Sequence, residues 1–173
     1  YTIHILYIQY IYNTYIIHIF YIYNTYMEFL HYAFVHNPSI GQTQGYMIPP
    51  INHLKKMCKF NGRTITGINY FDTTNNRPIH AEIDLITRLP LNKHKHRIIN
   101  LLVVRFDDKN NVFKMSKPCE NCVLSLKKKA FIKGYLIGDI YYSNIDGTLC
   151  RSSYVQLEND KQKYVSSYFR MLN

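Results

Sequence analysis

The sequence predicts an α/β fold with a mixed sheet of about five strands. The run 98–106 is mostly apolar and β-branched, which is typical of a central strand buried on both faces. Two segments that begin at prolines, 78–89 and 118–130, show the apolar spacing of helices. The turn 144–147 is too short for a crossover, so the strands on either side of it must be antiparallel. Helices that alternate with strands, and one antiparallel return, together indicate a mixed sheet.

The length and composition are those of a single globular domain with a strong positive charge. A chain of 173 residues corresponds to one domain with enough residues to bury a core. A hydrophobic fraction of 47% with 18% charged residues argues against intrinsic disorder, and four cysteines are too few for a disulfide scaffold. The 21 Lys and Arg against 11 Asp and Glu give a formal charge of +10, which favours polyanionic partners or anionic substrates.

The first 26 residues form a low-complexity Tyr/Ile-rich segment. The hexapeptide Tyr-Ile-Tyr-Asn-Thr-Tyr occurs in it twice, at 10–15 and 21–26, and no Asp, Glu, Lys or Arg is present. The segment is long enough to cross a membrane, but polar residues interrupt it, and no basic region precedes it as in a secretory signal. We therefore expect no membrane partner and an intracellular, cytoplasmic protein. Because a TATATA repeat encodes alternating Tyr and Ile, we interpret 1–26 as translated upstream sequence and 27–173 as the native domain.

The next segment supports two interpretations. Residues 28–36 can form a short helix, and a connector rich in Pro and Gly follows up to Pro50. Asn61-Gly62 predicts a type I′ hairpin between a stretch that ends at Phe60 and a strand over 63–71. The alternative for the first arm of this hairpin is a helix from Pro50, with apolar residues at helical spacing: Ile51, Leu54, Met57 and Cys58.

The two later helices have defined apolar stripes. Pro78 is expected in the first turn of the helix 78–89, whose buried face consists of Ile79, Ile83, Ile86 and Leu89. Pro118 is expected to open the helix 118–130, whose stripe consists of Cys122, Val123, Leu126 and Ala130.

Turns and strands complete the predicted order. Residues 107–111 turn the chain after the central strand, and 139–143 form the next strand. A strand that starts at Thr148 returns antiparallel to it. We expect a terminal helix over 157–173.

Four residues carry the chemistry of metal binding and proton transfer. Cys119 and Cys122 stand three apart at a helix start, so both sulfur atoms can reach one ion at about 2.3 Å. His80 would supply a third ligand and leave the fourth position of a tetrahedral zinc open to water, which is the catalytic arrangement. Glu82, two residues after His80, can stand beside that water as a proton carrier. A structural zinc half-site or a redox pair is the alternative interpretation of Cys-x-x-Cys.

These motifs also carry a family resemblance. His-Ala-Glu followed by Pro-Cys-x-x-Cys resembles the signature of the zinc-dependent cytidine and deoxycytidylate deaminase superfamily. The likeness covers roughly 54–155, and the expected order of elements is similar to that family's three-layer α/β/α sandwich. Gly134 to Gly138 looks like an insertion before the fourth strand, and the tight turn 144–147 is closer to the cytidine-deaminase branch of the family.

The resemblance implies roles for individual residues. It implies that one zinc ion per chain is held by His80, Cys119 and Cys122, and that Glu82 is catalytic. It also implies that Asn69, in Gly-Ile-Asn, binds the nucleoside and that the backbone near Ala81 and Cys119 contacts the base edge. For Asn69 the alternative is a simple turn residue at a strand end.

The implied reaction is hydrolytic deamination of cytidine, deoxycytidine or dCMP to the uracil product, in a protein that we expect to be a homo-oligomer. The alternatives are a deaminase that edits single-stranded nucleic acid, motivated by the charge of +10, and a zinc-binding protein without catalysis. The basic clusters 93–97 and 127–129 are more often solvated faces than binding patches. Tyr70 and Phe71 could stack on a base, while Cys58 and Cys150 are expected to be reduced core thiols.

Overall fold

The computed structural model describes residues 30–37, 40, 47–75, 77–93, 97–162 and 164–165. The Tyr/Ile-rich segment 1–26 lies outside the described residues, as do the first part of the expected helix 28–36 and the last part of the expected terminal helix 157–173. Positions 94–96 of the basic cluster 93–97 are also outside them.

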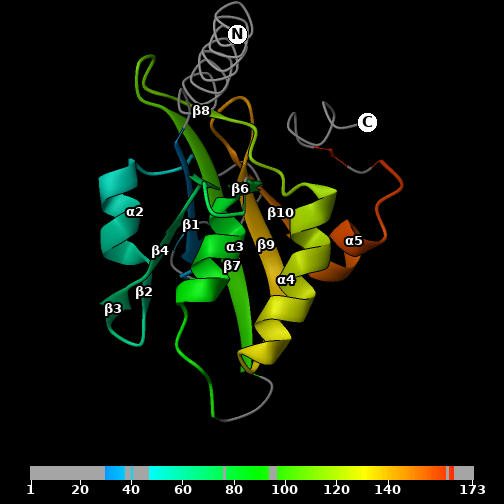
Figure 1. Ribbon diagram of the computed structural model, residues 1–173. Helices are drawn as coiled ribbons and strands as arrows, with labels where there is room; N and C mark the ends of the chain where they lie inside the picture. The colour runs from blue at the N-terminus through cyan, green and yellow to red at the C-terminus, as the bar shows by residue number, and fades with distance from the viewer. Residues whose placement is uncertain are drawn as a thin grey trace, which may run out of the picture.

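A mixed sheet forms the centre of the molecule (Figure 1). Its five ordered strands are β10 (Leu149–Ser153), β9 (Tyr135–Ser143), β7 (Arg97–Asp107), β1 (Leu30–Val35) and β4 (Thr66–Ile68), in that spatial order. A short sixth strand, β8 (Val112–Lys114), also pairs with β7. β7 and β9 are parallel, and the other neighbouring strands of this sheet are antiparallel. The predicted mixed sheet is confirmed, including the antiparallel return after 144–147.

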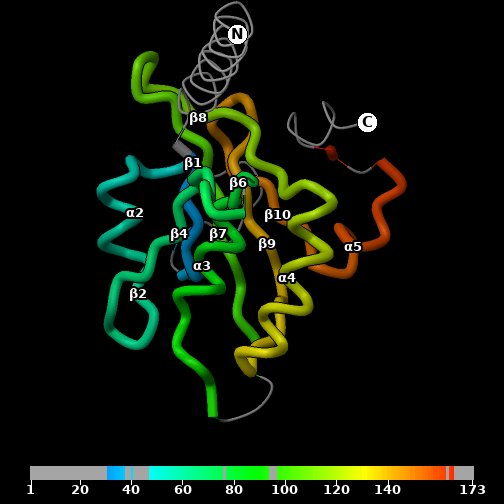
Figure 2. Tube along the Cα trace, viewed as in Figure 1, coloured from blue at the N-terminus to red at the C-terminus, as the bar shows by residue number. Residues whose placement is uncertain are grey.

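Helices cover both faces of the sheet, which gives three layers (Figure 2). One face packs against α3 (Ala81–Arg88) and α4 (Glu120–Ile132), and α5 (Tyr154–Glu158) joins this core. The other face packs against α2 (Ile51–Met57). The predicted α/β/α sandwich is confirmed.

The central strand β7 contributes to both hydrophobic cores. Leu101 and Val103 pack on the side of α3 and α4, while Leu102 and Val104 pack on the side of α2. Successive side chains of a strand point to opposite faces, so a continuous apolar run is what a strand between two helical layers requires. The prediction of a central strand buried on both faces is confirmed.

The expected helix over 28–36 is wrong, because Leu30–Val35 is the strand β1. Its side chains alternate: Ala33 belongs to the core under α3 and α4, and Tyr32 and Phe34 belong to the core under α2. β1 pairs with β4 on one side and with β7 on the other. Both pairings join distant parts of the chain, and this overrides any local helical preference.

The hairpin at Asn61-Gly62 is confirmed, with positive φ at both central residues, 50° and 76°. Its arms are short, β2 (Lys59–Phe60) and β3 (Arg63–Thr64), and they form a sheet of their own. The alternative helix from Pro50 is also present, as α2, and precedes the hairpin. A single strand over 63–71 is wrong, because the chain divides there into β3, β4 and β5 (Tyr70–Asp72).

The helix expected over 78–89 begins at Ala81, three residues later than Pro78. Pro78 lies in the short strand β6 (Arg77–Ile79), opposite Phe71 of β5. A proline is tolerated in a two-stranded edge ribbon of this kind. The expected placement of Pro78 in the helix is therefore wrong. Of the expected stripe, Ile83, Ile86 and Leu89 are buried, whereas Ile79 lies in β6 and is only partly buried against the same core.

The expected stripe of α4 is buried as well, and the helix is followed by Gly134 at a φ of +80°. Gly134 to Gly138 is not an insertion, because β9 already begins at Tyr135. The terminal helix expected over 157–173 is wrong in its described part: α5 is only Tyr154–Glu158 and is followed by irregular chain.

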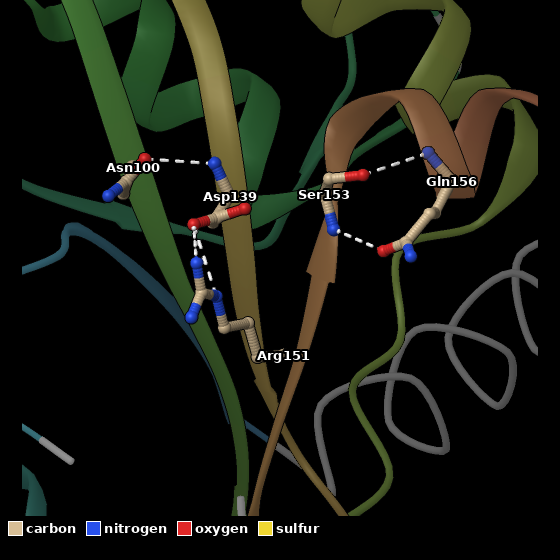
Figure 3. A network of polar contacts seen from close by, with 5 residues as sticks. All are labelled: Asn100, Asp139, Arg151, Ser153 and Gln156. Carbon is tan, nitrogen blue, oxygen red and sulfur yellow. Dashed lines mark hydrogen bonds and ion pairs between the residues drawn. The ribbon is translucent and has the colours of Figure 1, made fainter. Parts of the chain in front are cut away.

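Polar side chains secure the edge of the sheet around β9 and β10 (Figure 3). Asn100 accepts a hydrogen bond through Oδ1 from the N–H of Asp139 (2.8 Å), beside the register shift between β7 and β9. Arg151 of β10 pairs with Asp139 at 2.7 Å, and Ser153 and Gln156 form a reciprocal capping box at the start of α5. These contacts join β9 to β7 on one side and to β10 on the other, and they fix the point where the chain passes from β10 into α5.

Gly67 lets β4 and α3 approach each other closely. A Cβ atom at Gly67 would overlap the carbonyl oxygen of Ala81 and lie 2.5 Å from the backbone N of Leu85. Backbone atoms of a packed helix cannot move aside locally, so we expect Gly67→Ala to lower the free energy of unfolding by about 3 kcal/mol or more, as strong overpacking does. Urea titration checks this. Gly62→Ala is the matched control, because open space surrounds Gly62 and only its positive φ costs energy, about 1 kcal/mol.

Candidate metal centre

The structure brings His80, Cys119 and Cys122 together at the N-terminal ends of α3 and α4. Their potential ligand atoms all lie within 4.8 Å of one another. The Nδ1 atom of His80 lies 3.1 Å from Sγ of Cys122 and 3.5 Å from Sγ of Cys119. These three residues could hold one metal ion, and the expectation that the two motifs converge on one point is confirmed.

The helix starts place the ligands. His80 is the N-cap residue of α3 and Cys119 is the N-cap residue of α4, while Cys122 follows in the first turn of α4. On the α3 side, the carboxylate of Asp84 accepts a hydrogen bond from the N–H of Ile68 (3.0 Å) and one from Nε of Arg88 (2.7 Å), which fastens the helix to β4.

On the α4 side, a buried pair of serines fixes the chain just before Cys119. Ser116 donates its hydroxyl to the carbonyl of Val103 at 2.8 Å and accepts the N–H of Ser143 at 2.8 Å. Ser143 in turn donates its hydroxyl to the carbonyl of Lys114 at 2.6 Å. No sequence pattern indicates this role, because isolated serines are common in proteins.

The carboxyl group of Glu82 lies beside the three ligands and is withdrawn from solvent. Glu82 is only 3% exposed, and its Oε2 atom is buried without a hydrogen-bond partner among the described residues. Burial raises the pKa of this carboxyl group, and the nearby charge of His80 acts in the opposite direction. A buried polar atom without a partner is costly, so its presence next to a set of ligands indicates a position for a bound group.

The pKa values of the two thiols are shifted in opposite directions. A hydrogen bond from Cys122 lowers the pKa of Cys119 to about 4, and His80 acts in the same direction. The side-chain interaction with Cys119, followed by burial, raises the pKa of Cys122. The cluster is thus prepared to carry negative charge on sulfur, which a cation would stabilise further.

The donor set fits zinc. One imidazole nitrogen and two thiolates from the described residues are soft or borderline ligands of the kind that Zn²⁺ prefers, and three protein ligands leave room for a fourth. The Oε2 atom of Glu82, which finds no hydrogen-bond partner in the part of the chain that the structure describes, belongs to a carboxyl group next to this cluster.

Asn69 directly follows β4, and Ala81 is the first residue of α3. The Oδ1 atom of Asn69 accepts a hydrogen bond from the backbone N–H of His31 at 2.8 Å. This bond links the end of β4 to β1. Ala81 is fully buried directly after His80. A contact of either residue with substrate stays a prediction, and so does stacking by Tyr70, whose side chain is 45% exposed.

The remaining predictions concern the basic cluster 127–129, the two other cysteines and a membrane span. Lys127, Lys128 and Lys129 are exposed, and Lys127 pairs with Glu158 of α5 at 2.8 Å. Cys58 is a buried free thiol, and Cys150 is a half-buried one. None of the described helices has the length and apolar character of a membrane span.

Two residues near the site were missed by sequence reasoning, His31 of β1 and Arg105 of β7. They lie opposite each other in the register of the two strands. The period-two alternation of His31, Ala33 and Val35 against Tyr32 and Phe34 was the signal that could have identified this strand and its inner face.

Comparisons of the chain with protein families, with curated proteins and with solved structures found no match.

Proposed function

We propose that this protein is a zinc-dependent hydrolase that deaminates a cytosine nucleoside or nucleotide to the uracil product and releases ammonia. The observation that carries the proposal is the buried Oε2 of Glu82 beside the cluster of His80, Cys119 and Cys122, an atom that has no hydrogen-bond partner among the described residues. A structural zinc site needs no such carboxylate, whereas a hydrolytic site needs a proton carrier within reach of the attacking water.

Each residue of the cluster has a separate role in the proposed reaction. His80, Cys119 and Cys122 would hold the zinc ion, which lowers the pKa of water toward about 7 and so makes hydroxide available at neutral pH. Glu82 accepts the proton of the attacking water at a carboxylate oxygen and delivers it to N3 of the ring as hydroxide adds to C4. Glu82 then carries the second proton of that water to the leaving amino group. The sum is cytosine plus water giving uracil plus ammonia.

Burial of the carboxyl group supports this cycle. A general acid and base must take up and give up the same proton, and a desolvated carboxylate is a stronger base than an exposed one. The sheet and the two helices exclude bulk water from Glu82, so the proton that it carries stays with the substrate.

The test is release of ammonia by the zinc-loaded protein from four substrates: cytidine, deoxycytidine, dCMP and a single-stranded oligodeoxynucleotide. We expect turnover of at least one of the three small substrates, faster than that of the oligonucleotide. Turnover of the oligonucleotide alone would favour nucleic-acid editing. Absence of turnover with all four, at one bound zinc per chain, would contradict the proposal.

A further inference from the structure

One end of the molecule carries positive charge without acidic residues. Three segments meet at this end, 47–66, 86–104 and 121–138, and each of them contains four Lys or Arg residues and no Asp or Glu. The exposed cations here that form no ion pair with any described residue are Lys59, Arg63, Lys93 and Arg97. Because no carboxylate of these segments neutralises them, this end attracts anions.

Hydrogen bonds and strand pairing hold the three segments together. Asn92 donates its backbone N–H to the carbonyl of Lys133 at 2.8 Å. Arg97 donates through Nη1 to Oδ1 of Asn61 at 2.9 Å, and its guanidinium lies 4.5 Å from the centre of the Phe60 ring. The loop after α3, the turn after α4 and the β2–β3 hairpin therefore form one surface, at the end of the sheet where the parallel strands β7 and β9 begin (Figure 1).

The same end exposes large apolar side chains. Leu91 follows α3, Ile98 belongs to β7 and Ile132 ends α4, and each of these three is at least 65% exposed. Phe131 beside Ile132 and Leu136, the register partner of Ile98 in β9, are exposed as well. Apolar side chains that gather on a surface mark an interaction site. This end of the molecule, with its exposed cations and apolar side chains, is called the distal surface below.

The distal surface lies far from the candidate metal centre. Cys119 precedes the first residue of α4, and Ile132 is the last residue of that helix. The helix has 13 residues, so a rise of 1.5 Å per residue places its two ends roughly 20 Å apart. A partner bound at the distal surface therefore leaves the metal centre open to solutes.

The combination of charge and apolar side chains selects the class of partner. The phosphodiester backbone of a nucleic acid would pair with the cations but would leave aliphatic side chains such as Leu91 and Ile98 in water. A second copy of the chain could cover the apolar side chains, but a two-fold contact would bring the cations of both copies together. An anionic lipid surface satisfies both groups, because headgroups attract the cations while apolar side chains enter the acyl boundary.

We propose that the distal surface binds reversibly to anionic phospholipid membranes, with Leu91 entering the interface and with Lys93 and Arg97 at the headgroups. The expectation of no membrane partner was drawn from the segment 1–26 and does not concern a surface of the folded domain. The inference is independent of the proposed function, because lipid binding at this end uses neither the metal ligands nor Glu82.

Co-sedimentation of the full chain with lipid vesicles measures the binding. Vesicles of phosphatidylcholine with about 30% phosphatidylserine should bind at least about tenfold more tightly than vesicles of phosphatidylcholine alone, and added salt should weaken the binding. Lys93→Gln should weaken it about fivefold, and Leu91→Ser about tenfold or more. The matched controls, which should have no effect beyond about twofold, are Lys161→Gln after α5 and Ile145→Ser in the turn after β9, both at exposed positions.

A fluorescent reporter tests which side chain enters the membrane. The chain contains no Trp, so Leu91→Trp introduces a single tryptophan at the distal surface. Its emission should shift to shorter wavelength when the anionic vesicles are added, because the indole leaves water for the interface. Ile145→Trp is the control, and its emission should stay unchanged. Neither readout needs zinc or turnover, so failure of this inference is distinguishable from failure of the proposed function.

The same measurements can overturn the inference. Absence of vesicle binding, equal binding to neutral and anionic vesicles, or binding that Leu91→Ser and Lys93→Gln leave unchanged would each contradict it. If these two variants instead abolish binding of an oligonucleotide, or self-association, while vesicles are not bound, the partner is a nucleic acid or a second copy and the inference is overturned. Thermal unfolding shows whether each variant folds. If Leu91→Ser does not, Lys93→Gln decides: weakened vesicle binding supports the inference, and unchanged binding contradicts it.

Discussion

Glu82→Gln is expected to retain zinc and fold but to lose turnover by at least ~10² to 10⁴. The amide has nearly the shape of the carboxyl group, yet it cannot accept the proton of the attacking water. Stability should change little, because burial already disfavours the charged form of this carboxyl group and the amide is neutral. The measurement is initial-rate ammonia release, with zinc content determined on the same sample.

The matched control for this substitution is Glu158→Gln. Glu158 lies on α5, where its carboxylate pairs with Lys127 and is far in sequence from the ligands. Its replacement should leave the rate within a factor of two. Activity of Glu82→Gln within about threefold of the parent would exclude Glu82 as the proton carrier.

Cys119→Ser is expected to reduce bound zinc from one per chain to a small fraction of that value. The serine hydroxyl stays protonated at neutral pH and is a poor ligand, so two of three protein ligands remain. Metal analysis after gel filtration measures the loss. In a second readout, a chelator should lower the midpoint of thermal unfolding of the parent but not that of Cys119→Ser, because only the parent gains stability from bound metal.

Cys150→Ser provides the comparison for a cysteine outside the cluster. Cys150 is a half-buried thiol on β10, and its replacement should keep one zinc per chain. Full zinc retention in Cys119→Ser would contradict the assignment of the ligands.

The sequence predicted the parts of the fold that local patterns determine. Asn61-Gly62 specifies its turn through backbone conformation alone, and the stripe of α4 follows from helical spacing. The cluster of His80, Cys119 and Cys122 was predictable for a related reason: each motif lies at a helix start, and short spacing within a motif fixes which side chains meet one ion.

The errors arose where distant segments decide the structure. Residues 30–35 become a strand because β4 and β7 offer partners on both sides, and this information is not present in the segment itself. Pro78 marked a helix start by a general preference, but the pairing of β5 with β6 places it in a ribbon. The juxtaposition of His31, Arg105 and Lys114 was missed for the same reason, since these residues become neighbours only through the register of three strands.

The position of β1 between β4 and β7 has a consequence for biosynthesis. Tyr32 pairs with Val104, 72 residues later in the chain, so a ribosome that adds 5 to 20 residues per second completes this partner roughly 4 to 14 s after β1. During that interval β1 lacks its partner β7, and the nascent chain presents the edge of β1 that β7 later covers to its surroundings. Holdase chaperones that recognise extended apolar segments would have their main opportunity to bind before residue 107 has been synthesised, and much less afterwards.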